Sequence, residues 1–94
     1  MTKAQTLNDS AYCDNPERIA AYLNKALETN DTATIVKAIG NMIRAQGVSR
    51  LSRNTKLSRE GLYRSFSGQR SPAFKNVLDV LTAMDVKLVA RPTK

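Results

Sequence analysis

Apolar side chains recur three and four positions apart in three segments of the chain, and this spacing constrains the fold more than any other feature. It places them on one face of an α-helix, so we predict helices over residues 16–29, 32–46 and 73–84. The three stripes are Ile19, Tyr22, Leu23, Ala26 and Leu27; Ile35, Ile39, Met42 and Ile43; and Phe74, Val77, Leu78, Leu81 and Met84. Each stripe is expected to be buried, which predicts an all-α domain.

Residues that begin and end helices delimit these segments. Asn15 is expected to cap the first helix, with a proline at the first helical position. Asp31 or Thr32 can cap the second helix, and Gly47 stops it. Gly40 lies in the middle of the second helix, where it costs roughly 1 kcal/mol of helix propensity relative to alanine. A glycine at this position would permit close packing against a neighbouring helix.

Two shorter helices are predicted between the second and the last long segment. The first covers about residues 50–55 and is expected to be capped by Ser49. The second covers about residues 59–67, with Ser58 as its cap and Gly68 closing it. The last long helix then starts with a proline near its first turn.

The end of the chain differs because its apolar residues alternate. Residues 86–91, with the sequence VKLVAR, are expected to form a short strand or an extended arm. A single strand would need a second copy or another protein to pair with, and a frayed end fits the sequence equally well. We therefore divide the 94 residues into a flexible arm over 1–14, one domain over 15–91 and a tail over 92–94.

Composition excludes several classes of function. The chain has no histidine and one cysteine, Cys13, which argues against an internal disulfide and a structural zinc site. Nucleophilic and metal catalysis lack their usual side chains, so we expect neither an enzyme nor a bound cofactor or metal. The sequence shows no apolar run typical of a signal peptide and no stretch long enough to span a membrane. A cytoplasmic protein without membrane contact is expected.

Charge is unevenly distributed along the chain, whose net charge is +7. Residues 1–31 contain three basic and five acidic side chains, whereas residues 32–94 contain twelve basic and three acidic ones. A basic domain with a mildly acidic head suggests two surfaces, of which the basic one would be drawn to a polyanion such as nucleic acid. Charge alone is equally compatible with a soluble protein that has an excess of lysine and arginine.

The two short helices and the turn around Lys56 match the spacing of a helix-turn-helix motif over about residues 49–68. Four apolar side chains are expected to anchor the motif onto the longer helices: Leu51, Leu57, Leu62 and Phe66. With these turned inward, the opposite face of the second short helix projects into solvent. Such a helix can insert its first turns into the major groove of DNA.

The outer face of this helix and its surroundings supply the candidate DNA contacts. Base edges are expected to be read by Ser58, Arg59, Glu60, Tyr63 and Arg64. Phosphates are expected to be contacted by Ser49, Arg50, Arg53, Lys56, Ser67, Arg70 and Lys75. Arginine suits guanine or phosphate, glutamate can accept from a cytosine amino group, and tyrosine can pack on a thymine methyl group.

Each assignment has a simpler structural alternative. Glu60 and Arg64, four residues apart, could form only a solvent-exposed ion pair, worth roughly a few tenths of a kcal/mol. Tyr63 could cover the edge of the core, and Ser49 could act as a helix cap alone. The flanking arginines and lysines could be solvated surface charges.

Two stretches of the chain resemble a known family. The segments "NPERIAAYLNKALETND" and "GVSRLSRNTKLSREGLYRSFSGQRSPAFKNVLDVLTAMDVKL" are similar to addiction-module antidote proteins, with a likeness over roughly residues 12–91. These are small antitoxins of HigA-like type with a phage-repressor-like (Xre/Cro) helix-turn-helix. The resemblance implies a bacterial or prophage protein of about five helices that binds and represses the promoter of its own operon. It also implies a partner encoded beside it, a small toxin of the RelE/ParE-like ribonuclease or gyrase-inhibitor kind.

The resemblance also implies how the surfaces are used. The reading positions carried over are Ser58, Arg59, Glu60, Tyr63 and Arg64. Operators of this fold are usually palindromic, so we expect a homodimer with half-sites about 34 Å apart. Its contact would be residues 86–91 or the exposed side of the 73–84 helix. The acidic helix at 16–29 is a candidate surface for a basic toxin, unless it only packs on the domain.

The chain departs from the family pattern at three positions. Arg50 stands where relatives often have glutamine. Lys56 stands where the turn usually has glycine, so a non-glycine residue is expected to enter a left-handed or bridging conformation at about 1–2 kcal/mol. Gly61 stands where alanine is usual and is expected to soften the reading helix.

Two other functions remain compatible with the sequence. One is a free-standing phage-type repressor with no toxin partner. The other is a protein-interaction module that inhibits a toxin and never contacts DNA.

Overall fold

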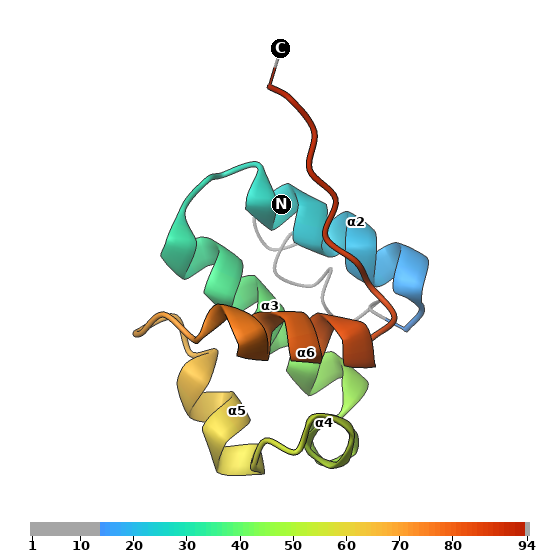
Figure 1. Cartoon of the computed structure of the whole chain (residues 1–94), viewed down its shortest axis with the longest axis vertical. Coiled ribbons are helices and arrows are strands. Elements are labelled where there is room, and N and C mark those ends of the chain that lie inside the picture. Colours follow the sequence, from blue (N-terminus) through green and yellow to red (C-terminus); the bar gives the residue numbers. More distant parts are fainter. Residues whose placement is uncertain (1–13, 94) are drawn as a thin grey trace, which may run out of the picture.

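A computed structural model describes residues 14–93, and within them the chain forms five helices and no strand (Figure 1). The helices are α2 (Pro16–Leu27), α3 (Thr32–Gln46), α4 (Val48–Thr55), α5 (Arg59–Ser65) and α6 (Phe74–Ala83). This confirms the prediction of a five-helix all-α domain with an extended C-terminal segment. The expected N-terminal arm, including Cys13 but not Asp14, lies outside the described residues, as does Lys94 of the tail.

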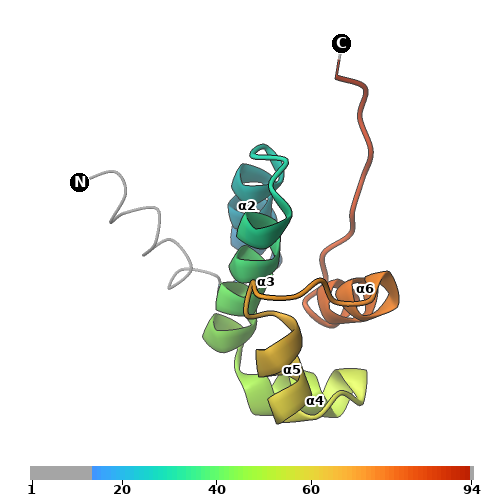
Figure 2. The ribbon, with the colours of Figure 1, turned by 90° about the vertical axis from the view of Figure 1, so that its left-hand side faces the viewer.

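Helices α2 and α3 pack against each other as a pair at one end of the molecule (Figures 1 and 2). The α2 helix begins as predicted, because the Asn15 side chain accepts a hydrogen bond of 2.8 Å from the backbone N–H of Arg18. Its stripe buries Ile19, Leu23 and Ala26. Leu27, which was expected in the same stripe, is instead 37% exposed.

The α3 helix is capped by Asp31, the first of the two predicted candidates. The Asp31 carboxylate accepts hydrogen bonds from the hydroxyl of Thr34 at 2.6 Å and from its backbone N–H at 3.0 Å. These two bonds, the hydroxyl first, lower the pKa of the exposed Asp31 carboxyl because they favour its charged form. The cap therefore gives the helix a negative charge at its N-terminus over the neutral pH range.

The structure corrects the bounds of both short helices. Gly47, with a φ of 104°, both ends α3 and precedes α4, which therefore starts at Val48. Ser49 thus lies inside α4, and its predicted role as the helix cap is wrong. The α5 helix ends at Ser65, two residues earlier than expected, because Phe66 leaves the helical conformation with φ −113° and ψ 32°.

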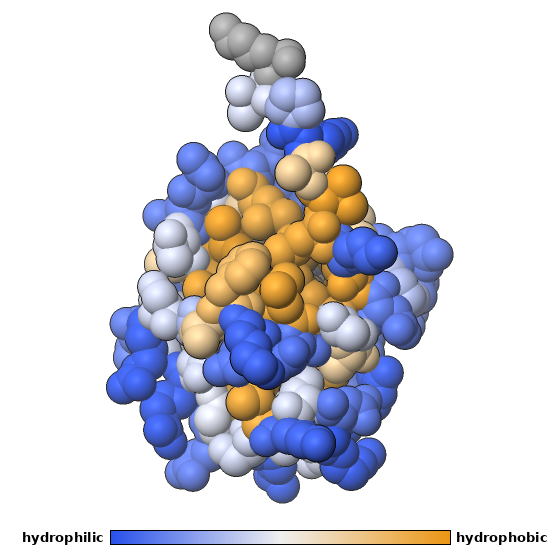
Figure 3. All heavy atoms as spheres, viewed as in Figure 1, coloured by the Kyte–Doolittle hydropathy of each residue, from blue (hydrophilic) through white to orange (hydrophobic). Residues whose placement is uncertain are grey.

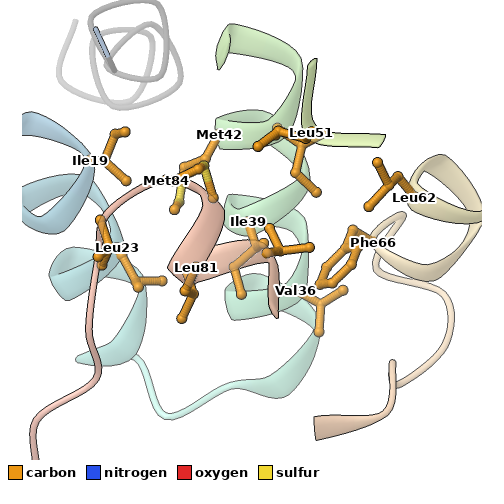
Figure 4. Packing of buried hydrophobic residues seen from close by; sticks show 13 residues of the cluster. Ile19, Leu23, Val36, Ile39, Met42, Leu51, Leu62, Phe66, Leu81 and Met84 are labelled. Carbon is orange, nitrogen blue, oxygen red and sulfur yellow. The ribbon is translucent and has the colours of Figure 1, made fainter. Parts of the chain in front are cut away.

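One core joins all five helices, and Figure 4 shows its central side chains. Leu51 of α4, Leu62 of α5 and the adjoining Phe66 are at most 1% exposed, as the sequence analysis predicted. They pack in one cluster with Val36, Ile39, Met42 and Ile43 from α3 and with Val80, Leu81 and Met84 from α6 and its end. Leu57 in the turn packs against this cluster while half-buried. The short helices are therefore held by the long ones.

The α6 helix buries only part of its predicted stripe: Leu81 and the adjoining Met84 are in the core, and Val77 packs against it. Val80 and Leu81 are buried, but Phe74 is 66% and Leu78 40% exposed, so the prediction that these two lie in the core is wrong. The α6 helix packs on α4, and no other described helix covers the side that carries Phe74 and Leu78.

The chain after α6 is extended but forms no strand within the described residues. Val86 is buried, and its N–H donates to the carbonyl of Leu81 at 2.9 Å, which holds the start of this segment against α6. The structure thus favours an extended arm over the predicted alternative of a strand. None of the helices between residues 14 and 93 combines the length and apolarity needed to cross a membrane.

Gly40 provides the close contact that its position in α3 predicted. A β-carbon on Gly40 would overlap with the carbonyl oxygen of Phe66, directly after α5. Substitution Gly40→Ala should therefore lower the free energy of unfolding by about 1–3 kcal/mol, because this overlap outweighs the gain in helix propensity of roughly 1 kcal/mol. Chemical denaturation followed by circular dichroism measures the change.

Asn24→Ala is a suitable control for this substitution. Asn24 is exposed in the interior of α2, so alanine there gains helix propensity without a steric conflict. An equal stabilisation by both alanine variants would contradict the close contact at Gly40.

Candidate nucleic-acid interface

The turn between α4 and α5 is fixed by hydrogen bonds from two α4 side chains. The Thr55 hydroxyl donates to the carbonyl of Leu51 at 2.7 Å and accepts from the N–H of Leu57 at 3.2 Å. The Ser52 hydroxyl donates to the carbonyl of Leu57 at 2.5 Å. The polar backbone of the turn is thus satisfied from within α4, which sets the direction in which the chain enters α5.

Lys56 adopts the left-handed conformation that was predicted for it, because it stands where the turn usually has glycine. Its φ is 66° and its ψ 13°, and its N–H closes α4 on the carbonyl of Ser52 at 3.0 Å. This conformation places a β-carbon close to the following carbonyl and costs a non-glycine residue roughly 1–2 kcal/mol. The chain therefore retains a basic side chain in the turn in spite of backbone strain.

The α5 helix begins with a side-chain cap and has one buried face and one exposed face. The Ser58 hydroxyl accepts a hydrogen bond of 2.8 Å from the N–H of Gly61. A β-carbon at position 61 would lie 2.9 Å from this hydroxyl, so the glycine leaves room for the cap. Leu62 and Phe66 occupy the core, and the opposite face is open to solvent.

All five predicted base-reading residues are exposed: Ser58, Arg59, Glu60, Tyr63 and Arg64. Tyr63 is 48% exposed, which argues against its alternative role as a cover for the core. No described residue forms an ion pair with Glu60 or Arg64, so the alternative of a structural pair between them is not realised here. These side chains therefore stand together on one outer surface without internal partners among the ion pairs of residues 14–93.

The predicted phosphate-contacting residues are also exposed: Ser49, Arg50, Arg53, Lys56, Ser67, Arg70 and Lys75. Three of them have partners within the chain. Arg50 donates to the side chain of Gln46 at 2.6 Å, and Lys75 pairs with Asp79 at 2.8 Å. The Ser67 hydroxyl donates to the carbonyl of Arg64 at 3.2 Å. These bonds are all at the surface, where water or phosphate can replace them.

Residues 48–75 form a strongly basic surface around α5. They contain seven arginines and lysines and a single acidic residue, Glu60. In Figures 1 and 2, α4 and α5 lie together at the end of the molecule opposite α2. The basic residues of α4, α5 and the turn between them therefore concentrate at one end, where they can meet an anionic polymer.

Ser52, Thr55 and Gly40 position this surface, and the sequence analysis did not assign the first two any role. In a sequence, small polar residues of a short helix look like ordinary surface positions. Their hydrogen bonds to the turn depend on the path that the backbone takes after α4. The pattern Ser-x-x-Thr before a glycine-like turn residue was the only signal for them.

The fold and the surface define a small all-α domain with a helix-turn-helix-like pair at its basic end. Residues 3–92 match the family of probable addiction module antidote proteins, and the chain belongs to this family. It is 33% identical over 78 residues to an uncharacterized protein of Haemophilus influenzae, an alignment that covers 83% of this chain and 80% of the relative. No solved structure matches the chain. Membership in an antidote family supports an antitoxin role and implies a cognate toxin as partner.

Lys56 allows backbone strain and charge to be tested separately. Lys56→Gly should raise the free energy of unfolding by about 0.5–1 kcal/mol, because relief of the left-handed strain exceeds the added entropy of the unfolded chain. Lys56→Ala should not stabilise the chain, since alanine keeps the strain. Thermal unfolding of both variants, compared at equal pH, measures the difference, and equal midpoints would show that the turn is unstrained.

Proposed function

We propose that this protein is a sequence-specific DNA-binding antitoxin that represses its own toxin–antitoxin operon and neutralises a RelE/ParE-like toxin. The observation that carries the DNA-binding part is the division of α5 into two faces. Leu62 holds the inner face in the core, while Arg59, Tyr63 and Arg64 project outward from a basic surface. A helix presented in this way can enter a major groove with its outer side chains at base edges.

The flanking residues support a two-part contact with DNA. Arg50, Arg53, Lys56 and Arg70 surround α5 in the sequence and are exposed, so they can neutralise phosphates on either side of the groove. Phosphate contacts set the position on the duplex, whereas Arg59 and Arg64 would discriminate between bases. We expect a palindromic operator bound by a homodimer, with half-sites about 34 Å apart.

The toxin part of the proposal rests on the family and on α2. The inner stripe of α2 packs on α3, and its outer face stays a candidate surface for the toxin. Its outer face still carries Glu17 and the adjoining Glu28 in solvent, far from α4 and α5 (Figure 1). A basic toxin could therefore bind at this end while α5 remains accessible to DNA.

Substitution of the reading arginines tests DNA binding. Arg59→Ala and Arg64→Ala should each weaken binding to the DNA upstream of the gene by about 1–3 kcal/mol, because each removes a base contact. Wild-type affinity should also fall steeply with salt concentration. Fluorescence anisotropy with labelled duplex, repeated with a scrambled sequence, measures both effects.

Lys25→Ala is the matched control, because it removes one positive charge from exposed α2 at the other end of the molecule. It should change the affinity by much less than either arginine variant. Alanine variants that bind the operator as tightly as wild type would contradict base reading by Arg59 and Arg64. A wild type that does not bind the operator at all would favour a module that acts only on a toxin.

Co-purification tests the toxin partner. The chain, expressed together with the small open reading frame beside its gene, should retain that product through affinity and size-exclusion steps. The Arg59→Ala variant should retain it equally, because α5 is not expected to contact the toxin. Failure to form a complex, together with intact operator binding, would instead support a free-standing repressor.

A further inference from the structure

A recess of about 300 Å³ lies between α2 and α3, and none of the predicted DNA contacts lines it. Ala26 and Ala38, both buried, form its apolar floor, because their methyl groups leave space where the two helices pack. The recess is separate from the apolar side chains exposed around α6 and the C-terminal segment in Figure 3, since it shares no lining residue with the grooves found there. It is therefore a surface with its own chemistry.

The charge of the recess is positive. Lys25 from α2 and Lys37 from α3 line it and are exposed, whereas no acidic side chain of residues 14–93 does so. Asp31 adjoins the recess through Thr34, but its carboxylate already accepts two hydrogen bonds from that residue. An anion in the recess would therefore meet two cations and no carboxylate on the walls.

The recess also contains a hydroxyl group whose proton is unused. The hydroxyls of Thr29 and Thr34 both donate within the chain, at 2.7 Å and 2.6 Å. The Tyr22 hydroxyl differs, because it accepts from the side-chain amide of Asn41 at 3.0 Å while no described residue accepts from it. Tyr22 is half-buried and packs against the core, so this donor is held in place. A ligand that accepts hydrogen bonds would satisfy it.

Lys37 is positioned by the loop that follows α5. A β-carbon on Gly68 would lie 2.6 Å from Cγ of Lys37 and 3.0 Å from its Cδ, so the glycine makes room for the lysine side chain. A stem packed in this way has fewer conformations to lose when its ammonium group binds an anion. The cationic wall of α3 is thus partly ordered before any ligand arrives.

These features favour an acidic protein segment as the occupant. A carboxylate accepts several hydrogen bonds, which suits two lysines and a tyrosine O–H, and an adjoining apolar side chain suits the alanine floor. A nucleic acid would need a longer run of cations along its backbone, which α4 and α5 provide and two lysines do not. A basic toxin would be repelled here, in contrast to the outer face of α2 with Glu17 and Glu28.

We propose that the recess between α2 and α3 is a docking site for a further protein partner with an acidic segment. An aspartate or glutamate of this segment accepts hydrogen bonds from Lys25, Lys37 and Tyr22, and an apolar side chain beside it covers Ala26 and Ala38. The site lies apart from the outer face of α5, so the partner and DNA can be bound together. The inference therefore does not depend on the proposed function.

Nuclear magnetic resonance titration of the full chain tests the site. The probe is a short synthetic peptide of leucine and glutamate, compared with its leucine–glutamine counterpart at about 0.3 M salt, which screens the exposed charges elsewhere. The acidic peptide should shift the backbone amide signals of Tyr22, Lys37 and Asn41 in a saturable way, with at least about tenfold higher affinity than the glutamine peptide.

Substitutions in the recess should weaken this binding. Lys25→Gln/Lys37→Gln should lower the affinity for the acidic peptide at least about tenfold, because both charged donors are lost. Tyr22→Phe should lower it about threefold or more, since it removes the hydroxyl and keeps the ring. Glutamine at position 37 retains most of the stem that packs on Gly68, so circular dichroism should show an unchanged fold.

Arg53→Gln/Lys56→Gln is the matched control, because it removes two positive charges from exposed residues outside the recess. It should keep peptide affinity and lose operator affinity, whereas Lys25→Gln/Lys37→Gln should do the reverse. Loss of operator binding in the wild type, with intact peptide binding, would count against the proposed function alone.

Several outcomes would overturn the proposal. These are equal affinity for the glutamine peptide, signal shifts confined to α4 and α5, absence of saturation, and a peptide affinity that survives Lys25→Gln/Lys37→Gln. Equivalent shifts of the recess signals by short duplex DNA would make the recess part of the nucleic-acid surface instead. If Asp9→Asn alone moved the signals of Tyr22 and Lys37 without peptide, the chain's own N-terminal residues would be the occupant, and the proposal would also fail.

Discussion

The contact between Gly40 and the end of α5 determines where the basic surface points. Helix α5 has only seven residues and cannot be stable alone, so its position depends on Leu62 and Phe66 in the core. Phe66 reaches α3 at the place where the absence of a side chain lets its carbonyl approach. The orientation of the outer face therefore follows from a backbone contact on the inner side.

The helical arrangement was predictable because the sequence of each long helix shows its buried face by apolar spacing and its ends by capping residues. Asn15, Asp31 and Ser58 cap helices as their positions indicated, and Leu51, Leu62 and Phe66 are buried as the spacing required. Lys56 was expected in a strained turn and is found there. These features depend on interactions between residues close in sequence or on strict periodicity, both of which a sequence displays directly.

The errors have a common cause in tertiary packing. The stripe of α6 is apolar on more than one side, and the sequence cannot say which side meets α4, so Phe74 and Leu78 were placed in the core although they are exposed. Ser49 was predicted to be a cap because it precedes the short helix expected from the sequence. In the structure a single glycine with positive φ joins α3 to α4, and a local sequence pattern does not show so short a connection. The hydrogen bonds of Ser52 and Thr55 to the turn likewise depend on where the chain goes next. The candidate base-reading residues are exposed as predicted, because the outer face of α5 follows from its buried one, and their contact with DNA stays a prediction.

The division of α5 between packing and exposure has an evolutionary consequence. Arg59, Glu60, Tyr63 and Arg64 carry no share of the core, so replacing them changes the chemistry offered to a ligand while the fold remains stable. Descendants of a duplicated gene could thus diverge rapidly in what they recognise at this end. Leu62 and Gly40, on the inner side of this contact, would diverge more slowly, because a substitution at either would disturb the packing of α5 in every descendant.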